Sequence, residues 1–525
     1  MKKAKPIMTA AEVAATIKDG QTVASTGFVQ SSIPEALLTA LENRFLETGS
    51  PKNLTAFYPG SQGDPGAQKA GRPNRGGDHF AHPGMVKRAI TGHYNTAPAL
   101  GKCIMENKIE GYNFPQGTLS MLCRDIAAGK IGTITHVGLH TFVDPRNQGG
   151  KLNDITKEDL VEIVNIGGKE LLWYKAFPID VVFLRGSYAD ENGNVTVHKE
   201  IGPGEVTAIA QATKNSGGKV YVQVEKIVKA GTLDPRLVRI PGIYVDALVI
   251  SEPHEHEQSF GCPYDPSLSG DLKVPVNSLA PMPLDAKKVI GRRAAMELTE
   301  DTVVNLGIGA PEYVSAVANE EGIGSYMTLT VEAGPVGGVP QGGPRFGSSM
   351  NPEAILSHHE QFDFYDGGGV DFAFLGLAQA DTDGNVNVSK FGPRLAGPGG
   401  FINITQNSKR VFYCGTFTAS GLKTVVADGK LTITNEGSEK KFIKQVEHIT
   451  FSGKYASAQG KPVMYITERA VFELRKDGVY LIEIAPGIDL QTQVLDLMEF
   501  APKMDGQPKL MDERIFKDEL MGLNK

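Results

Sequence analysis

The sequence contains few cysteines, one tryptophan and no long apolar run. Its 525 residues include four cysteines, at positions 103, 123, 262 and 414. None lies close enough to another to form a metal-binding pair, and so few cysteines argue against a disulfide-rich secreted fold. We therefore expect reduced thiols, buried as small hydrophobic side chains, in a cytoplasmic protein.

Features of a membrane protein or a nucleic-acid-binding protein are also lacking. No segment approaches the roughly 18 uninterrupted apolar residues of a transmembrane helix. The charged first residues are not followed by the apolar run of a signal peptide. The net charge is −7, whereas nucleic-acid-binding domains carry a basic surface. We expect neither a membrane nor a nucleic acid among the partners.

Glycine, in contrast, is abundant, with 61 residues, many of them directly after apolar segments where strands should end. The hydrophobic fraction of 41% is ordinary for a globular protein. A chain of this length favours two or more domains, each with its own core.

One sequence pattern occurs twice in the chain. The first copy begins at Asp180 and the second at Asp371, and each continues into an Asp-x-x-Gly-Asn motif. The copies are 191 residues apart (371 − 180), which indicates one duplicated unit. A shorter similarity relates residues 21–23 to residues 301–303. Such a chain predicts two similar domains that enclose a cleft.

Both halves also show the same order of predicted elements. The first half has a helix after the Thr9–Glu12 capping box, a strand at residues 22–25 and a helix entered at Pro34. The second half has a helix from Asp285, a strand at residues 302–306 and a helix after Pro311. This alternation predicts an α/β fold of two similar duplicated domains. Each should have a largely parallel sheet flanked by helices, with the active site in the cleft between them.

The domain boundary is predicted from composition. Residues 252–283 are rich in proline, serine, glycine and charge, without apolar periodicity. We predict an N-terminal domain over residues 1–251, a linker over 252–284 and a C-terminal domain over 285–525. A second irregular stretch, residues 60–84, is a long glycine-rich loop of the kind that is usually functional or mobile.

Glu332 is the leading candidate for a reactive residue. It follows the apolar segment 328–331 and precedes several glycines, so it should lie at the carboxyl end of a strand, where ligands of open α/β sheets bind. The glycines would let a ligand approach the backbone. Counting 39 residues back from each repeat aspartate places Thr141 opposite Glu332 (180 − 39 and 371 − 39), so the two copies differ there. The alternative is a solvated glutamate at a strand end.

Two glycine clusters could bind anions through backbone amides. Gly397, Gly399 and Gly400 form a turn whose N–H groups can face an oxyanion. Gly307, Ile308 and Gly309 follow a strand and precede a helix, a position suited to a phosphate. An ordinary tight turn is the alternative for the cluster at 397–400, and the segment at 307–309 is not the six-position dinucleotide fingerprint.

Two histidine-rich segments have the composition of metal ligands but not a convincing pattern. They are His254-Glu-His256-Glu257 and His358-His359-Glu360. In polar surroundings such runs are more often solvated side chains, so we expect no metal site.

Several segments together resemble the class I coenzyme A transferase family, from about residue 8 to the C-terminus. They are Gly27-Phe28 with Pro34, Phe114–Leu119, Val331–Gly334 and Gly397–Phe401. The closest resemblance is to single-chain propionate/acetate CoA-transferases, which share the segments Phe142–Lys151, Gly415–Thr418, Tyr465–Arg469 and Ile484–Gly487.

The resemblance implies a ping-pong transfer of CoA between short monocarboxylic acids through a thioester on Glu332. It nominates the Gln116 side chain and the Gly400 amide as oxyanion donors, together with the Gly399 amide. Coenzyme A is then substrate and covalent intermediate, without a permanently bound cofactor. The resemblance also implies that the protein forms a homo-oligomer, a tetramer. It further implies a role in short-chain fatty acid metabolism during fermentation.

The expected acids are propionate, acetate and butyrate, with lactate and acrylate as further candidates. The residues near the nucleophile are small or apolar and suit a short alkyl tail: Ala333, Pro335, Val336 and Val339. Ala333-Gly334 also stands where the succinate-using branch has Asn-Gly, which argues against a dicarboxylate.

Two other functions fit the same residues. An acyl-CoA hydrolase on this scaffold would release CoA without any acceptor acid. A non-catalytic sensor of CoA or another metabolite would have no need of Glu332 and would never become labelled with CoA.

Overall fold

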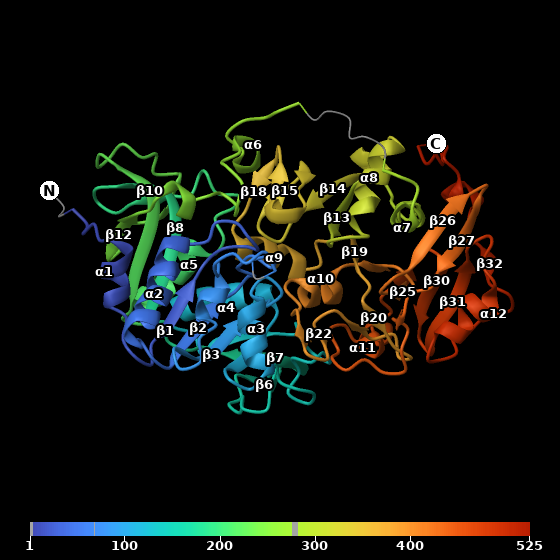
Figure 1. Cartoon of the computed structure of the whole chain (residues 1–525), viewed down its shortest axis with the longest axis horizontal. Coiled ribbons are helices and arrows are strands. Elements are labelled where there is room, and N and C mark those ends of the chain that lie inside the picture. Colours follow the sequence, from blue (N-terminus) through green and yellow to red (C-terminus); the bar gives the residue numbers. More distant parts are fainter. Residues whose placement is uncertain (1–3, 68, 276–281, 525) are drawn as a thin grey trace. The chain divides into compact units, whose positions relative to one another are not determined.

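The computed structural model describes residues 4–67, 69–275 and 282–524, which belong to two compact units (Figure 1). Unit 1 comprises residues 1–274, 331–363 and 390–403, and unit 2 comprises residues 275–330, 364–389 and 404–525. Two segments of the C-terminal half therefore belong to unit 1. The sequential domains 1–251 and 285–525, and the cleft between them, stay a prediction.

The main sheet of unit 1 has nine strands. Its path is β11-β9-β8-β1-β2-β3-β4, and β10 pairs with both β8 and β12. The pairings among β4, β3, β2, β1, β8, β10 and β12 are parallel, and β9 is antiparallel to β8 and β11. The strands are β1 (Thr22–Ser25), β2 (Leu54–Tyr58), β3 (Val86–Thr91), β4 (Glu110–Asn113), β8 (Val181–Asp190), β9 (Val195–Thr196), β10 (Lys219–Val228), β11 (Val238–Ile240) and β12 (Ala247–Ile250).

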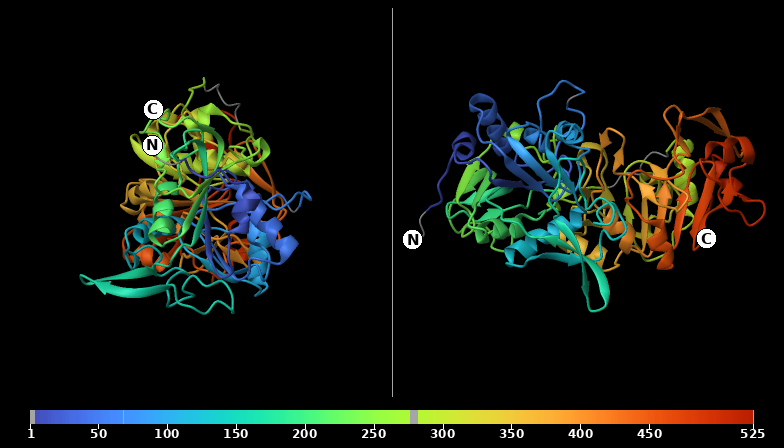
Figure 2. Two further views of the ribbon diagram at one scale, coloured as in Figure 1. Left: turned by 90° about the vertical axis from the view of Figure 1, so that its left-hand side faces the viewer. Right: turned by 90° about the horizontal axis from the view of Figure 1, so that it is seen from below.

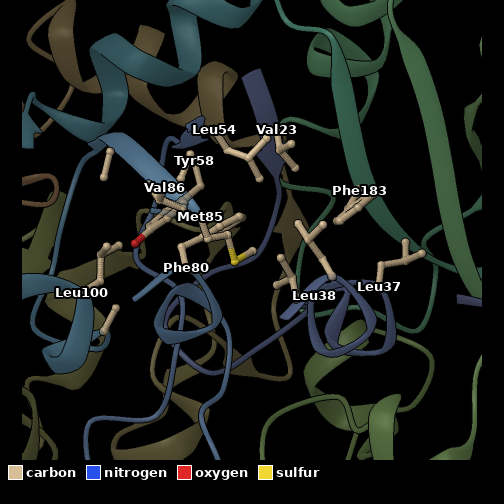
Figure 3. Close-up of a cluster of buried hydrophobic side chains, with 14 of the residues drawn as sticks. Val23, Leu37, Leu38, Leu54, Tyr58, Phe80, Met85, Val86, Leu100 and Phe183 are labelled. Atoms are coloured by element: carbon tan, nitrogen blue, oxygen red, sulfur yellow. The ribbon is translucent and has the colours of Figure 1, made fainter. Parts of the chain in front are cut away.

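Two helices of unit 1 begin where the sequence predicts. The Thr9–Glu12 capping box opens α1, and Pro34 caps α2. The larger helices are α1 (Ala10–Ala15), α2 (Glu35–Thr48), α3 (Pro98–Met105), α4 (Gln116–Ala127) and α5 (Val206–Asn215). Figure 3 shows Leu37 and Leu38 of α2 beside Val23 of β1 and Phe183 of β8, all fully buried. This apolar contact fixes α2 on the sheet.

Smaller elements complete unit 1. The linker predicted over 252–284 contains η2 (Pro253–Glu255) and α6 (Pro266–Ser269), and its residues 276–281 lie outside the described ones. A separate sheet has the order β5-β7-β6, and its β6–β7 hairpin extends away from the rest of the unit (Figure 2). The short strands are β5 (Gly132–Thr135), β6 (Val161–Ile166), β7 (Lys169–Lys175), β15 (Pro335–Val336), β16 (Val339–Pro340), β17 (Ser349–Met350), β18 (Ala354–Ile355), β22 (Lys390–Phe391) and β23 (Arg394–Leu395).

Unit 2 contains a second sheet with parallel strands in the order β14-β13-β19-β24-β29, followed by β30, β31 and β32. Asp285 caps α7, and Pro311 precedes α8, as predicted. The strands are β13 (Thr302–Leu306), β14 (Met327–Thr330), β19 (Phe372–Gly376), β24 (Arg410–Cys414), β29 (Val463–Ile466), β30 (Ala470–Arg475), β31 (Gly478–Ile484) and β32 (Lys509–Leu510).

Outside this sheet lie short strands and helices. The strands are β20 (Gln379–Ala380), β21 (Val386–Asn387), β25 (Thr418–Ala419), β26 (Lys423–Ala427), β27 (Lys430–Asn435) and β28 (Glu439–Lys440). The helices are α7 (Ala286–Ala295), α8 (Glu312–Glu320), α11 (Gly453–Ala458) and α12 (Leu490–Gln493). Helices α9 (His358–Asp366) and α10 (Phe401–Asn407) begin in unit 1 and end in unit 2. Within the described residues, no helix combines the length and the apolar character needed to cross a membrane.

The duplication is visible in equivalent hydrogen bonds. The Asp180 carboxylate accepts from the Thr22 backbone N–H at 2.7 Å, and the Asp371 carboxylate accepts from the Val303 N–H at 2.8 Å. In both copies, the aspartate of the Asp-x-x-Gly-Asn motif accepts hydrogen bonds from the backbone and the side chain of its asparagine. The α/β fold with similar, largely parallel sheets is therefore confirmed.

The two copies of the shorter similarity are separated by one residue more than the sequence comparison predicts. The sequence comparison sets Thr22 opposite Thr302, 280 residues on (302 − 22). The two hydrogen bonds from the repeat aspartates instead make Val303 the equivalent of Thr22, 281 residues on (303 − 22). The alternating side chains of a strand do not reveal such a shift when both neighbours are β-branched.

Candidate active site

Glu332 lies in a tight turn two residues after β14. The backbone N–H of Gly334 donates to the Val331 carbonyl at 2.9 Å, and the N–H of Val331 donates to Pro335 at 2.9 Å. Gly334 has φ +122°, and a Cβ there would lie 2.0 Å from the Leu356 carbonyl oxygen. Only glycine fits this position, so the turn holds Glu332, which is half-buried, in one place.

The other glycines after Glu332 have a structural role instead of admitting a ligand. A Cβ on Gly337 would lie 2.7 Å from the Glu353 carboxyl carbon, and one on Gly338 would lie 2.3 Å from the Met350 carbonyl oxygen. The space that these glycines leave is filled by the chain itself. The expectation that they open the backbone to a ligand is therefore wrong.

The position equivalent to Glu332 in the first copy is Pro59, not Thr141. Since Thr22 and Val303 are equivalent, their strand partners Thr55 and Thr328 are equivalent as well. Four residues further along each chain lie Pro59 and Glu332 (55 + 4 and 328 + 4). Thr141 follows β5, outside this strand. Counting along the sequence missed this because the loops of the two copies differ in length, but the predicted difference between the copies remains.

Gln116 and the glycine cluster at 397–400 lie together in unit 1. Gln116 begins α4, and its backbone N–H donates to the Gly399 carbonyl at 3.0 Å. Its side-chain Oε1 lies 3.5 Å from the place that a Cβ on Gly399 would occupy. The two segments are 283 residues apart in the sequence (399 − 116), and both were predicted to surround a developing oxyanion.

The hydrogen bonds of this cluster distinguish its two amides. The N–H of Gly399 donates to the Gly92 carbonyl at 2.9 Å, so this amide already has a hydrogen-bond acceptor within the protein. In the described part of the chain, the N–H of Gly400 is without a hydrogen-bond acceptor. Of the two amides nominated by the sequence, Gly400 therefore stays the candidate oxyanion donor, and this role stays a prediction.

Sequence reasoning missed His93, which lies against the same cluster. Its Cδ2 is 3.6 Å from the Cβ position of Gly399, and its Nδ1 is 3.0 Å from the Ser61 hydroxyl. Burial lowers the pKa of His93 to about 4, so the ring is neutral near pH 7. A lone histidine outside any motif carries no sequence signal of this placement.

A narrow pocket lies beside Ala333, the residue after Glu332. Phe28 and Ile201 form part of its apolar wall, and Glu205 and His358 form part of its polar wall. Of the four residues predicted to suit an alkyl tail, Ala333 lines this pocket. The other three, Pro335, Val336 and Val339, are occupied in strand pairs with β17 and β18.

Aromatic contacts connect this pocket to the start of α4. The ring of His358 packs edge-on against Phe28 and Phe362, with centroids 5.7 Å and 5.2 Å away. The Phe362 ring in turn fills the space beside Gly117, where a Cβ would lie 2.3 Å from it. Within unit 1, packed rings thus connect the pocket beside Ala333 to Gly117, the residue after Gln116.

Gly307, Ile308 and Gly309 belong to unit 2. They follow β13 and precede α8, as predicted. Gly309 has φ +90° with no atom within 4 Å of its Cβ position, and the Ile308 side chain is 62% exposed. The loop therefore has the open backbone that an anionic ligand requires, and its role in binding CoA stays a prediction.

One histidine of each histidine-rich segment makes hydrogen bonds within the protein, whereas the sequence predicts solvated side chains. His256 bonds through Nδ1 to the Ser251 hydroxyl at 2.8 Å, and burial lowers its pKa to about 2. His358 bonds to Glu205. Among the described residues, no group of three or more His, Cys, Asp or Glu side chains is placed to hold a metal ion.

Comparison with known proteins gives consistent results. The family model described as "Coenzyme A transferase" matches residues 7–251. Acetate CoA-transferase YdiF of Escherichia coli O157:H7 is 44% identical over 519 residues, which is 98% of this chain and 96% of that protein. Caffeate CoA-transferase of Acetobacterium woodii is 46% identical over 495 residues, 93% of each chain.

A solved structure is similar over the same length. It is the acyl-CoA transferase YdiF from Escherichia coli O157:H7, crystallised as a thioester complex with CoA. The TM-score is 0.91 at 43% identity, with 99% of this chain and 97% of that chain covered.

Proposed function

Because the chain belongs to the coenzyme A transferase family and is thus an enzyme that transfers CoA between acids, we propose that it carries CoA as a thioester on Glu332. The observation that carries this proposal is the placement of Glu332. It lies in a turn that only Gly334 allows, while the equivalent position of the first copy is a proline that cannot react. The similarity to an enzyme crystallised as a CoA thioester supports it.

The nucleophile does not have to give up a proton to a base before it attacks. A glutamate with an ordinary pKa of about 4.3 is ionised at neutral pH. Its oxygen attacks the acyl-CoA carbonyl carbon, the C–S bond breaks, and an acyl-glutamyl anhydride and CoA thiolate form. The thiolate then attacks the Glu332 carbonyl carbon, the anhydride C–O bond breaks, and the first acid leaves as its carboxylate. The second acid reverses both steps.

Each step passes through a tetrahedral oxyanion, and fixed donors stabilise it. We assign this role to the backbone N–H of Gly400 and the side chain of Gln116. The contact between Gln116 and Gly399 supports the assignment because it holds both donors on one packed cluster. Loss of one such donor typically lowers the rate by about 10²–10³-fold.

The proposed acids are acetate, propionate and butyrate, with lactate and acrylate as further candidates. The small Ala333 beside Glu332 and the similarity to an acetate CoA-transferase support short tails. One methylene discriminates by about 10–200-fold, so the preference among these acids should be graded. Succinate should be poor, because its second carboxylate would be buried unpaired.

Mass spectrometry of the intact protein and of its proteolytic peptides, after incubation with acetyl-CoA, tests the proposal. We expect the mass of CoA minus water on the peptide that contains Glu332, discharged quickly by propionate and slowly by succinate. The variant Glu332→Ala should take no label, and Glu353→Gln, which changes an exposed glutamate of the same segment, should label normally.

Other outcomes identify the alternatives. Label on another residue, or an active Glu332→Ala, would refute the assignment of Glu332. Steady release of CoA without an acceptor would indicate a hydrolase, and a protein that never labels would indicate a sensor. We further propose a cytoplasmic homo-oligomer, a tetramer.

A further inference from the structure

His358 and Glu205 form a buried pair on the wall of the pocket beside Ala333. The Nδ1 atom of His358 lies 2.9 Å from Oε2 of Glu205, and both side chains are almost completely buried. Since an ionised carboxylate only accepts hydrogen bonds, Nδ1 carries the proton. In the neutral imidazole, the other nitrogen, Nε2, is then a hydrogen-bond acceptor.

Polar atoms around this pocket lack partners. Nε2 of His358 is buried without a hydrogen bond in the described structure, and so are Oε1 of Glu205 and the Ser32 hydroxyl. All three residues line the same pocket. Buried polar atoms are almost always paired, so a group of them at one pocket requires a partner, either a water molecule or a polar group of a ligand that takes its place.

The size of the pocket limits what that ligand can place there. Its free volume is about 20 Å³, which admits a group the size of a water molecule. The edge-on rings of Phe28 and Phe362 hold His358 in place, so the pocket cannot widen by rotation of the histidine alone. A hydroxyl matches both the size and the chemistry, since it can donate to Nε2 and accept from the Ser32 hydroxyl.

We propose that His358, oriented by Glu205, is a specificity-determining residue that binds a hydroxyl group on the tail of the acid. This inference rests on the proposed function, because the pocket adjoins Ala333, next to the CoA-carrying glutamate. A hydroxyl bound here favours hydroxylated short acids over alkyl acids of equal length. A site built to bind a hydroxyl leaves its polar atoms unpaired when the hydroxyl is missing.

The test compares acids that differ only in the hydroxyl. The kcat/KM for 2-hydroxypropanoate and for 3-hydroxypropanoate is divided by that for propanoate, with acetyl-CoA as donor. In His358→Asn, the amide can still donate to Glu205, but the Nε2 acceptor is lost. We expect at least one ratio to fall about tenfold, the value of one hydrogen bond, and the acid affected shows where the hydroxyl lies.

A matched control and a second variant complete the test. His256→Asn removes another buried Nε2 that lacks a hydrogen bond but does not line the pocket, and both ratios should stay unchanged. Ser32→Ala should lower the same ratio as His358→Asn. It replaces His358→Asn as the test if His358→Asn does not fold. Unchanged ratios in variants that still transfer CoA would overturn the inference. A wild-type protein that transfers CoA to none of these acids would instead refute the proposed function.

Discussion

At the scale of single residues, Gly334 controls where Glu332 lies. The substitution Gly334→Ala places a Cβ against the Leu356 carbonyl and forces φ +122° on an L-residue. Strained backbone of this kind costs on the order of 1–3 kcal/mol. A nucleophile displaced by about 1 Å can lose about 10²-fold in rate. We expect a fall in kcat of that order and a lower melting temperature, measured by steady-state kinetics and thermal unfolding.

Gly343→Ala is the matched control for this prediction. Gly343 also has a positive φ, +60°, but no atom lies near its Cβ position. It should lose some stability and keep kcat. If both variants had the same kcat, the turn at Gly334 would not position Glu332.

At the scale of elements, a charged cluster fastens the 60–84 loop to α2. His79 lies between two carboxylates of α2, with Nε2 3.0 Å from Glu35 and Nδ1 2.5 Å from Glu42. Burial alone would lower the pKa of His79, but the two carboxylates outweigh it and raise the pKa to about 9. The described residues of this loop are thus anchored at its end near α2.

This cluster predicts a pH-dependent stability. Because the folded pKa of His79 is raised above its ordinary 6.5, its contribution is complete below pH 6.5 and is lost as pH rises through about 9. The wild type should be stabilised relative to His79→Gln at pH 6, on the order of 3 kcal/mol, and this difference should shrink toward pH 9.5. Thermal unfolding across that range measures it.

A difference between wild type and variant that stayed constant from pH 6 to 9.5 would contradict a charged His79. His198→Gln is the control, since burial lowers the pKa of His198 and it has no such carboxylate pair. The stability difference between the wild type and this variant should not shrink as pH rises from 6 to 9.5, because a lowered pKa favours the folded wild type once the ring has lost its proton.

At the scale of the whole molecule, one carrier residue predicts ping-pong kinetics. The first acid leaves before the second binds, so initial rates at several fixed acid concentrations should give parallel double-reciprocal lines. Lines that converge to the left of the axis would show a ternary complex and no free thioester enzyme. The Glu332→Ala variant sets the background rate for these measurements.

The fold was largely predictable from the sequence because its signals are local. The capping box at Thr9, the prolines that precede α2 and α8, and the short apolar segments each depend on a few neighbouring residues. The repeat further predicts that the two sheets share one topology, since two copies of a unit have the same strand order.

The site was predictable only where a motif marks it. Glu332, Gln116 and Gly400 stand in such motifs. His93 and the pair of His358 with Glu205 do not, because long-range packing brings them to the site. The same limit explains the error over Gly337 and Gly338, whose neighbours come from β17 and from the residues between β17 and β18.

The equivalence of Pro59 with Glu332 shows how the two copies of the repeat differ at this strand end. The Pro59 carbonyl oxygen and the Gln116 Cβ lie 2.3 Å and 2.6 Å from the Cβ position of Gly92. The strand end that carries Glu332, the proposed nucleophile, in one copy thus corresponds, in the other, to part of the wall behind Gln116. If Glu332 carries CoA as proposed, a glutamate introduced at position 59 would meet packed backbone and add no second carrier, so the stoichiometry of bound CoA should stay at one per polypeptide.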